Sequence, residues 1–375
     1  MKARRVVSTV FCIVFVLLIV GGGAATLFRT PGQISYSERR QLKQWETPTI
    51  NTIRDGTWFT FLDKYMLDQF PGRDGFRRIK SVFEFNVMRQ TQNNGIVIHD
   101  SQAAEISYPL TEKAESVYIK RINKLCEKYL SDPSLHIYTT VIPDKMKYMA
   151  GEIGAPTLDY DALADRIASE VTAAKYIDIY DTLSLDDYYG TDVHWRQECI
   201  IPTAKKLLSE MHGGNCAGMR VSDGLAPFYG VYYGQSALPL APDKIITVTS
   251  DKLDAARVLR ADKKTGELGE GKLYYEENIT ATGDGYDVFL GGASTVTVIE
   301  AKNPATDRTL YLFSDSFGRS LAPLLLGDYA RVVVYDIRYI RTELALEKIA
   351  IEPGSDVLIA YSIPSIKVAG NLQVD

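Results

Sequence analysis

The stretch "LYLFSDSFGRSLAPLLL" (310–326) decides the fold, because it changes from a strand pattern to a helix pattern across a polar turn. The apolar residues from Thr309 to Phe313 predict a buried strand, and the apolar run after the turn predicts a helix. A serine at such a turn lies at the carboxyl edge of the sheet, where open α/β folds place their ligands. The N–H groups that begin the new helix point the same way and favour an oxyanion, as does the helix dipole. Ser316 is therefore a candidate nucleophile and Asp315 a support for the turn, although the two residues also fit an ordinary helix cap.

Outward from this stretch, strands alternate with helices along the chain. "NNGIVIHD" (93–100) predicts a turn into a short strand. Further strands are predicted at 136–144, 176–181, 331–336 and 356–361, and helices at 111–130, 160–174 and 202–212. This alternation predicts an α/β fold with a central parallel sheet that is flanked by helices. Residues 230–302 change to short strands, turns and glycines, which indicates a β-rich insert in the same domain.

The amino terminus predicts a membrane segment. Lys2, Arg4 and Arg5 precede an uncharged stretch over residues 6–28. A helix of that length, rising ~1.5 Å per residue, spans the ~30 Å hydrocarbon core of a bilayer. The positive cluster predicts that the amino end stays cytoplasmic and that the rest of the chain lies outside the cell membrane. The small residues 21–25 leave cleavage and secretion open, but the apolar stretch is longer than a signal-peptide core and favours an uncleaved signal-anchor.

The sequence predicts three parts. Residues 1–29 form the transmembrane segment, 30–58 a polar linker with prolines, and 59–375 the α/β catalytic domain. At the start of that domain, apolar residues at helical spacing predict an amphipathic helical region that stops at Pro71-Gly72 and resumes through Phe76, Ile79, Phe83 and Val87.

The composition limits the classes of function. The 375 residues are 46% hydrophobic and 24% charged, and the net charge of −5 argues against a nucleic-acid partner. The four cysteines (Cys12, Cys126, Cys199 and Cys216) and the scarce histidines show no metal-ligand spacing, so we expect neither a metal nor a cofactor. A Cys199–Cys216 disulfide and unpaired buried thiols are both compatible with the sequence.

The segment "YYGTDVHW" (188–195) supplies a candidate base. An aspartate two residues before a histidine can accept the imidazole Nδ1 proton, which leaves Nε2 free to act on a serine. Asp192 and His194 therefore suit Ser316, although His194 could equally be a surface or structurally satisfied histidine. Because both segments follow predicted strands, we expect them at one edge of the sheet.

Several ordered blocks resemble those of the DHHW family, which is related to the SGNH-like alginate O-acetyltransferase proteins. The blocks include "FLDKYMLDQFPGRDGFRRIK" (61–80), "TVIPDKMKYM" (140–149), "YDTLSLDDYYGTDVHW" (180–195), "YDVFLGGA" (286–293), "SDSFGRSLAPLL" (314–325) and "VVYDIRY" (333–339). The Asp-x-His pair precedes the serine here, as it does in that family. The eponymous Asp-His-His-Trp is Asp192-Val193-His194-Trp195 in this chain, and Ala293 stands where many relatives have asparagine, so an oxyanion donor is missing if that asparagine supplies one.

The resemblance implies an SGNH-like fold and a cell-surface acetyltransferase or acetyl esterase that acts on an extracellular or cell-wall polysaccharide. Its catalytic residues would be Ser316, His194 and Asp192. The substrate-binding residues would be Arg338, Trp195, Gly292 and Asp315. It also implies that a membrane-bound O-acyltransferase supplies the acetyl groups. Arg338 fits equally well as an ion-pair partner of Asp336.

A second interpretation is a catalytically weak or inactive carbohydrate-binding or assembly protein that retains the fold. The alanine at 293 and the 23 tyrosines, whose rings suit sugar surfaces, favour this alternative.

Overall fold

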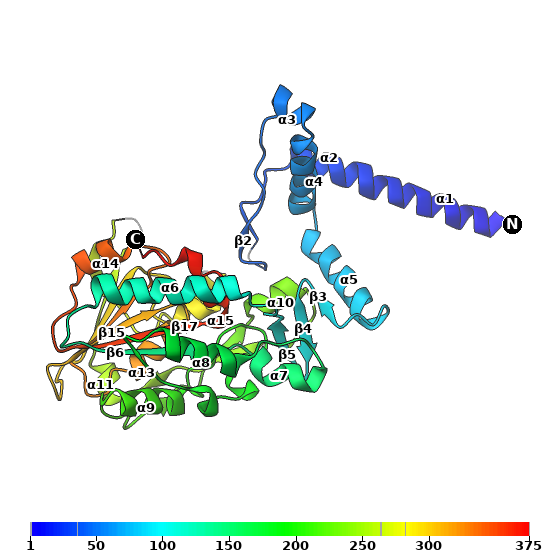
Figure 1. The fold of residues 1–375 in the computed structure, drawn as a ribbon. Coiled ribbons are helices and arrows are strands. Elements are labelled where there is room, and N and C mark those ends of the chain that lie inside the picture. Colours follow the sequence, from blue (N-terminus) through cyan, green and yellow to red (C-terminus); the bar gives the residue numbers. More distant parts are fainter. Residues whose placement is uncertain (1, 36, 263–264, 282, 375) are drawn as a thin grey trace. The chain divides into compact units, whose positions relative to one another are not determined.

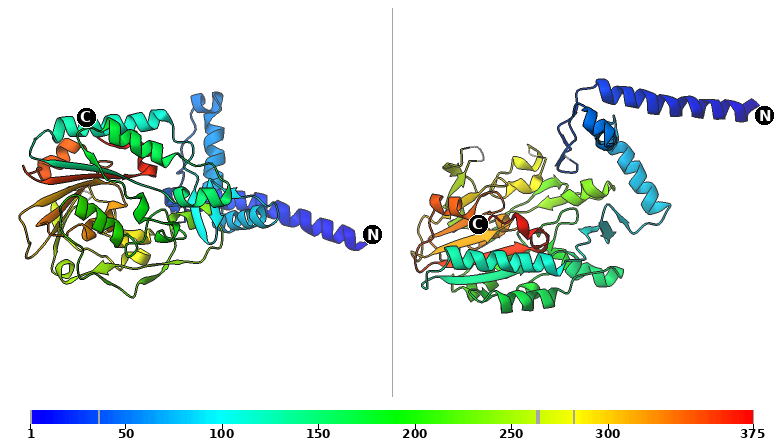
Figure 2. Two further views of the ribbon diagram at one scale, coloured as in Figure 1. Left: turned by 60° about the horizontal axis from the view of Figure 1, so that its bottom comes forward. Right: turned by 45° about the horizontal axis from the view of Figure 1, so that its top comes forward.

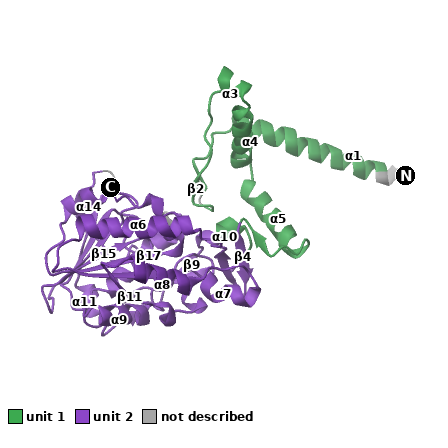
Figure 3. Ribbon diagram, viewed as in Figure 1, with its two compact units in different colours: residues 1–94, 233–239 green, residues 95–232, 240–375 purple. Residues whose placement is uncertain are grey.

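The strand predicted from 309–313 lies inside an eight-stranded sheet in the computed structural model of the protein, which describes residues 2–35, 37–262, 265–281 and 283–374. The chain divides into two compact units (Figure 3). Unit 1 contains residues 1–94 and 233–239, and unit 2 contains residues 95–232 and 240–375.

The central sheet of unit 2 has the strand order β13-β12-β14-β16-β15-β17-β6-β7. Five neighbouring strands are parallel: β16 (Arg331–Tyr335), β15 (Thr309–Ser314), β17 (Asp356–Ser362), β6 (His136–Ile142) and β7 (Lys175–Tyr176). Every residue of β15 and β17 is buried, as expected for parallel strands that are covered on both faces. The predicted α/β fold with a central, mostly parallel sheet is thus confirmed.

Helices flank this sheet on both faces (Figures 1 and 2). Helix α6 packs with α8 and α15, and α13 packs with α9. The helices of unit 2 are α6 (Glu112–Tyr129), α7 (Met146–Ile153), α8 (Tyr160–Glu170), α9 (Ile201–Glu210), α11 (Asp251–Asp254), α12 (Asn278–Ala281), α13 (Gly318–Leu324), α14 (Thr342–Lys348) and α15 (Ile363–Lys367).

The β-rich insert adds strands to the edge of the same sheet. Strands β14 (Val296–Glu300), β12 (Arg257–Ala261) and β13 (Leu268–Gly271) continue it beyond β16 in antiparallel order. The remaining short strands of unit 2 form antiparallel pairs: β4 (Ile96–His99) with β5 (Gln102–Glu105), β8 (Arg220–Val221) with β11 (Val248–Thr249), and β9 (Leu225–Phe228) with β10 (Asp243–Ile245).

The prediction of a strand at 176–181 is wrong over most of this range. Strand β7 ends at Tyr176, and a 3₁₀ helix follows at Tyr180–Thr182. The side chain of Asp178 accepts a hydrogen bond from the Tyr180 N–H at 2.9 Å, and this local turn competes with strand pairing.

Unit 1 contains the apolar amino-terminal helix. Residues Arg5–Phe28 form a helix that is long and apolar enough to cross a membrane, with a mean hydropathy of 2.6, and this helix fits a single-pass anchor. This apolar helix, which we call the anchor helix or anchor, comprises α1 (Lys2–Val16), a π-helical turn (Leu17–Gly21) and α2 (Gly22–Phe28). The other elements of the unit are β1 (Ile34–Ser35), β2 (Arg40–Gln41), α3 (Ile50–Arg54), α4 (Thr57–Gln69), α5 (Arg73–Asn86) and β3 (Gln92–Asn93), and α10 (Val231–Ser236) contributes residues to both units. The sequence predicted that the α/β domain begins at residue 59, whereas the contacts group residues 59–94 with the anchor.

Candidate active site

Ser316 lies in the tight turn between β15 and α13. Gly318 makes this turn possible, because a Cβ atom there would lie 2.4 Å from the Ser314 Oγ. Asp315 secures the turn: its carboxylate accepts hydrogen bonds from the Ser362 N–H at 2.9 Å, the Ser362 hydroxyl at 2.6 Å and the Phe317 N–H at 3.0 Å. Asp315 and Phe317 are buried, whereas Ser316 between them is partly exposed.

The loop that carries His194 folds back on itself. A β-bridge joins Tyr188 to Trp195, and the Tyr189 N–H donates to the His194 carbonyl at 3.1 Å. Asp192 and His194 therefore lie within one closed loop, and the Asp192 Oδ1 accepts from the His194 N–H at 3.1 Å. The Asp192 Oδ2 accepts from the Val231 N–H at 2.8 Å, so both carboxylate oxygens are held.

The two predicted segments meet although they are 122 residues apart. His194 Nε2 lies 2.8 Å from Ser316 Oγ, and His194 Nδ1 lies 2.6 Å from Asp192 Oδ1. Asp192 is fully buried, so its carboxylate keeps the Nδ1 proton on the ring, and Nε2 is then the acceptor for the serine hydroxyl. This geometry allows a proton to pass from the alcohol to the imidazole.

Aromatic rings fix the plane of the imidazole. The Tyr286 ring stacks parallel to His194, with 3.7 Å between ring centroids and 4° between planes, and the Phe317 ring lies at 4.8 Å. The Tyr286 hydroxyl donates to Ser320 Oγ at 2.8 Å, and burial raises the pKa of Tyr286, which keeps this hydroxyl protonated. Ser320 on α13 therefore connects the stacked Tyr286 ring to the helix that follows Ser316.

Two residues that were predicted to bind substrate are buried. Trp195 is fully buried, and its Nε1–H donates to Ser320 Oγ at 2.9 Å, so its indole is bonded to α13. Asp315 is also buried and its carboxylate is occupied by Ser362 and Phe317. The polar atoms of both residues thus have partners within the fold, and substrate contact by Trp195 and Asp315 stays a prediction.

Arg338 and Gly292 also have partners within the protein. The Arg338 guanidinium donates to both Asp336 oxygens, at 2.8 Å from Nε and 2.7 Å from Nη2, which is the ion pair that the sequence left as the alternative. Gly292 has φ of +79°, and a Cβ atom there would lie 2.2 Å from Asp287 Oδ1. The glycine therefore allows the Asp287 side chain to approach the backbone closely, and substrate contact by Gly292 and Arg338 stays a prediction.

A lysine and an aspartate hold the backbone just before Asp192. Lys145 is buried, and its ammonium donates to the carbonyls of Ala103 at 2.7 Å, Gly190 at 3.2 Å and Tyr189. Asp243 accepts from the N–H groups of Gly190 at 2.7 Å and Thr191 at 2.8 Å. Burial lowers the pKa of Lys145 to about 7, although the nearby carboxylates of Asp192 and Asp243 act in the opposite direction.

The supporting residues Tyr286 and Lys145 carry no local signal in the sequence. Tyr286 lies within the quoted block 286–293 and Lys145 within the block 140–149, but no local spacing marks either as a neighbour of His194. All four cysteines are free, so Cys199 and Cys216 form no disulfide. Across the described residues, no group of three or more His, Cys, Asp or Glu side chains is arranged to hold a metal ion.

A Ser-His-Asp line joins the turn after β15 to a neighbouring loop, within an α/β fold whose central sheet is mostly parallel. Solved structures with this fold include a DHHW family protein from Eubacterium siraeum, with 19% sequence identity and a TM-score of 0.58 over 76% of this chain and 95% of that one. PatB1 of Bacillus cereus, solved with a sulfonyl adduct, has 16% identity and a TM-score of 0.58 over 72% of this chain and 95% of that one. No protein-family model matches the chain, and no curated protein sequence matches it. At these identities the likeness establishes the fold, and at that level the resemblance to the DHHW family is confirmed.

Proposed function

We propose that the protein is a membrane-anchored O-acyltransferase or esterase that moves acetyl groups onto or from a cell-surface polysaccharide. The observation that carries the proposal is the line from Asp192 through His194 to Ser316, with donor–acceptor distances of 2.6 and 2.8 Å. A serine is a poor nucleophile without an adjacent base, and an imidazole oriented by a carboxylate is the commonest way to supply one.

In the first half of the reaction, Ser316 Oγ attacks the carbonyl carbon of an acyl donor while His194 Nε2 takes the hydroxyl proton. The tetrahedral intermediate collapses when the bond to the donor oxygen breaks, and His194 returns the proton to that leaving alcohol. An acyl-serine remains. In the second half, a sugar hydroxyl or water attacks the acyl carbon, His194 takes its proton, and Ser316 leaves with that proton restored. Asp192 stabilises the imidazolium in both halves.

Backbone groups at the turn supply the oxyanion donor. The Ser316 N–H has no hydrogen-bond acceptor among the described residues, whereas the Phe317 N–H is occupied by Asp315. The Ser316 N–H is therefore the donor that we assign to the tetrahedral oxyanion. With alanine at 293, no side-chain amide adds to it there, and removal of one such donor typically costs a factor of ~10²–10³ in rate.

The proposal also includes the acceptor of the acyl group, the source of that group and the side of the membrane on which the catalytic unit lies. The resemblance to the DHHW family supports a polysaccharide acceptor, and a membrane-bound O-acyltransferase would deliver acetyl groups to Ser316. The anchor and its preceding basic cluster support a catalytic unit on the extracellular side.

The test measures release of nitrophenol from para-nitrophenyl acetate, with and without an oligosaccharide acceptor, by the wild-type chain and Ser316→Ala. Ser314→Ala is the matched control, because Ser314 is a buried serine two residues away whose hydroxyl donates to the Ala360 carbonyl at 2.8 Å. We expect Ser316→Ala to lose at least about 10³-fold in rate and Ser314→Ala to retain most of it.

Acetylated oligosaccharide among the products would identify a transferase, and acetate alone an esterase. If Ser316→Ala keeps the wild-type rate, the serine is not the nucleophile and the proposal fails. Sugar binding by a folded wild-type chain without any turnover would favour the carbohydrate-binding alternative.

A further inference from the structure

Helix α5 presents one row of apolar residues outward. Phe76, Ile79 and Phe83 are exposed by 45%, 69% and 53%, and Val87, just after the helix, by 62%. Their spacing places them on one side of the helix, and we call them the apolar stripe. A helix on the surface of a water-soluble unit normally turns such a stripe toward the core. In α5, by contrast, the apolar stripe faces away from the rest of unit 1.

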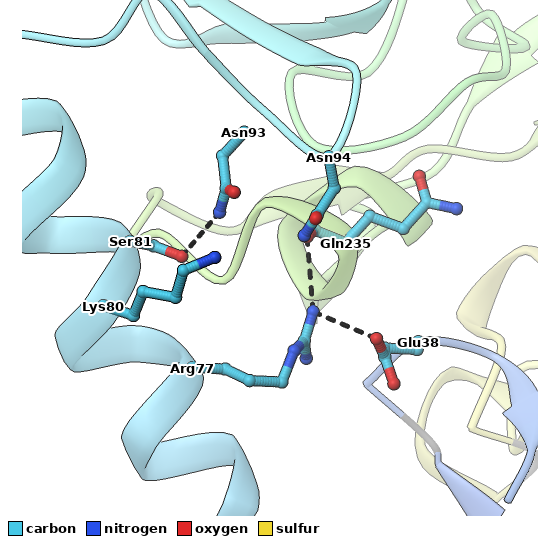
Figure 4. A pocket seen from close by; sticks show the side chains of 7 residues that line it. All are labelled: Glu38, Arg77, Lys80, Ser81, Asn93, Asn94 and Gln235. Carbon is cyan, nitrogen blue, oxygen red and sulfur yellow. Dashed lines mark hydrogen bonds and ion pairs between the residues drawn. The ribbon is translucent and has the colours of Figure 1, made fainter. Parts of the chain in front are cut away.

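The side of α5 opposite the stripe contacts the protein through polar residues, together with the half-buried Val82 and Phe85. Ser81 is the buried residue of this helix, and its hydroxyl accepts from Asn93 Nδ2 at 2.6 Å. Arg77 donates to the Gly234 carbonyl at 2.9 Å and lies 3.2 Å from a Glu38 oxygen. Figure 4 shows the Ser81 hydroxyl next to Asn93 and the Arg77 guanidinium next to Glu38, around a small polar pocket within unit 1. These bonds hold the helix with its apolar stripe outward.

The charges on α5 suit an anionic surface. Of its four basic residues, Arg73 and Arg77 form ion pairs with Glu38 within unit 1, which leaves Arg78 and Lys80 as the exposed cations. Amphipathic helices that lie on membranes combine such basic residues with phenylalanine or leucine on the apolar face. Anionic headgroups attract basic residues that lie near the bilayer surface.

The anchor indicates the depth of this surface. An apolar groove is lined by Leu18 and Ile19 of the anchor together with Phe70 and Phe76, and a Cβ atom on Gly22 would lie 2.4 Å from the Phe70 ring. If the hydrocarbon core begins at Arg5, a rise of ~1.5 Å per residue places Leu18 to Gly22 ~20–26 Å along a core of ~30 Å. Because Phe70 and Phe76 lie beside these anchor residues, the corner between α4 and α5 then lies ~4–10 Å inside the far boundary of the hydrocarbon core. Interfacial helices bury their apolar faces to a similar depth of ~5–10 Å.

We propose that the apolar stripe of α5 lies in the interface of the lipid bilayer, beside the point where the anchor leaves it. The occupant of this surface is a leaflet with anionic headgroups. Unit 1 then contacts the membrane through two elements, the anchor and α5, and the inverted orientation of α5 has a physical cause. This inference does not depend on the catalytic proposal.

The test uses the full chain, reconstituted in vesicles of phosphatidylcholine and phosphatidylglycerol. A fluorophore is attached at Phe83→Cys on the stripe or, as the matched control, at Arg78→Cys, which lies about 140° around the same helix. Cys12 and Cys199 are first replaced by serine, since Cys126 and Cys216 are buried. Nitroxide groups on the lipid chains quench a fluorophore in the bilayer, and aqueous iodide quenches one in water.

We expect the lipid nitroxide to remove most of the emission at position 83 and little at position 78, and iodide to do the opposite. Omission of phosphatidylglycerol should weaken the lipid quenching at position 83. Iodide quenching at position 83 equal to that at position 78 would overturn the proposal. Protection from both quenchers would also overturn it, because a second copy or another protein would then cover the stripe.

Discussion

His194 is held by three different segments of the chain. Asp192 bonds its Nδ1, the Tyr286 ring covers one face at 3.7 Å, and Phe317 packs at 4.8 Å. Proton transfer depends on the position of Nε2 relative to the serine oxygen, and small displacements of a catalytic group can lower a rate ~10²-fold. Tyr286 is therefore a positioning residue in the proposed mechanism, and it does not itself exchange a proton.

Replacement of Tyr286 tests this role. We expect Tyr286→Phe to keep the stacked ring and most of the activity, because only the hydrogen bond to Ser320 is lost. Tyr286→Ala should lower kcat by about 10–100-fold with little change in KM, since the imidazole gains freedom while the acyl site is unchanged. Esterase kinetics of the two variants measure this difference. Equal losses in both variants would show that the ring does not position His194.

At the scale of elements, residues from three different elements bond to the backbone of residues 189–191 or to the lysine that holds it. Lys145, at the start of α7 after β6, binds the carbonyls there, and Asp243 at β10 binds the N–H groups. The carbonyl of Ala103 on β5 takes a further bond from the same ammonium at 2.7 Å. The loop that carries Asp192 is thus tied to the hairpin β4–β5 and to the sheet edge.

The buried ammonium predicts a dependence of stability on pH. Burial lowers the pKa of Lys145 from the usual 10.5 to about 7 in the folded state. Between these values the unfolded chain holds a proton that the folded chain has released, so the free energy of unfolding should rise with pH. From pH 7 to 10.5, the free energy of unfolding of the wild-type protein should rise by on the order of a few kcal/mol relative to that of Lys145→Met. Urea unfolding of both proteins across this range measures the difference, and parallel curves would contradict the prediction.

Most strands and helices of unit 2 could be predicted from local patterns. The runs at 136–144, 309–313, 331–336 and 356–361 are each short and apolar, and each is a strand of the central sheet. Local patterns failed at 176–181, where the Asp178 side chain bonds the backbone and ends the strand. They also could not show that β12 to β14 join the central sheet, because strand pairing between distant residues has no local signal.

At the scale of the whole molecule, the strand-end argument holds for Ser316, whose turn directly follows β15. It does not account for Asp192 and His194, because their loop lies well beyond the end of β7. The supporting residues could not be predicted, since Tyr286 and Lys145 reach the site only through the tertiary fold. The burial of Trp195 could not be predicted either, because its partner Ser320 is 125 residues away in the chain.

Covalent labelling of the full chain by an aromatic sulfonyl fluoride tests the central claim most directly. PatB1, which shares the fold, has been solved with a sulfonyl adduct, and a sulfonyl group is attacked by activated hydroxyls. Peptide mapping by mass spectrometry locates the adduct and follows its rate. We predict one adduct, on Ser316, and a loss of at least about 100-fold in its rate of formation in His194→Ala. An adduct at another residue, or labelling of Ser316 at the same rate without the histidine, would contradict the proposed pairing of these two side chains.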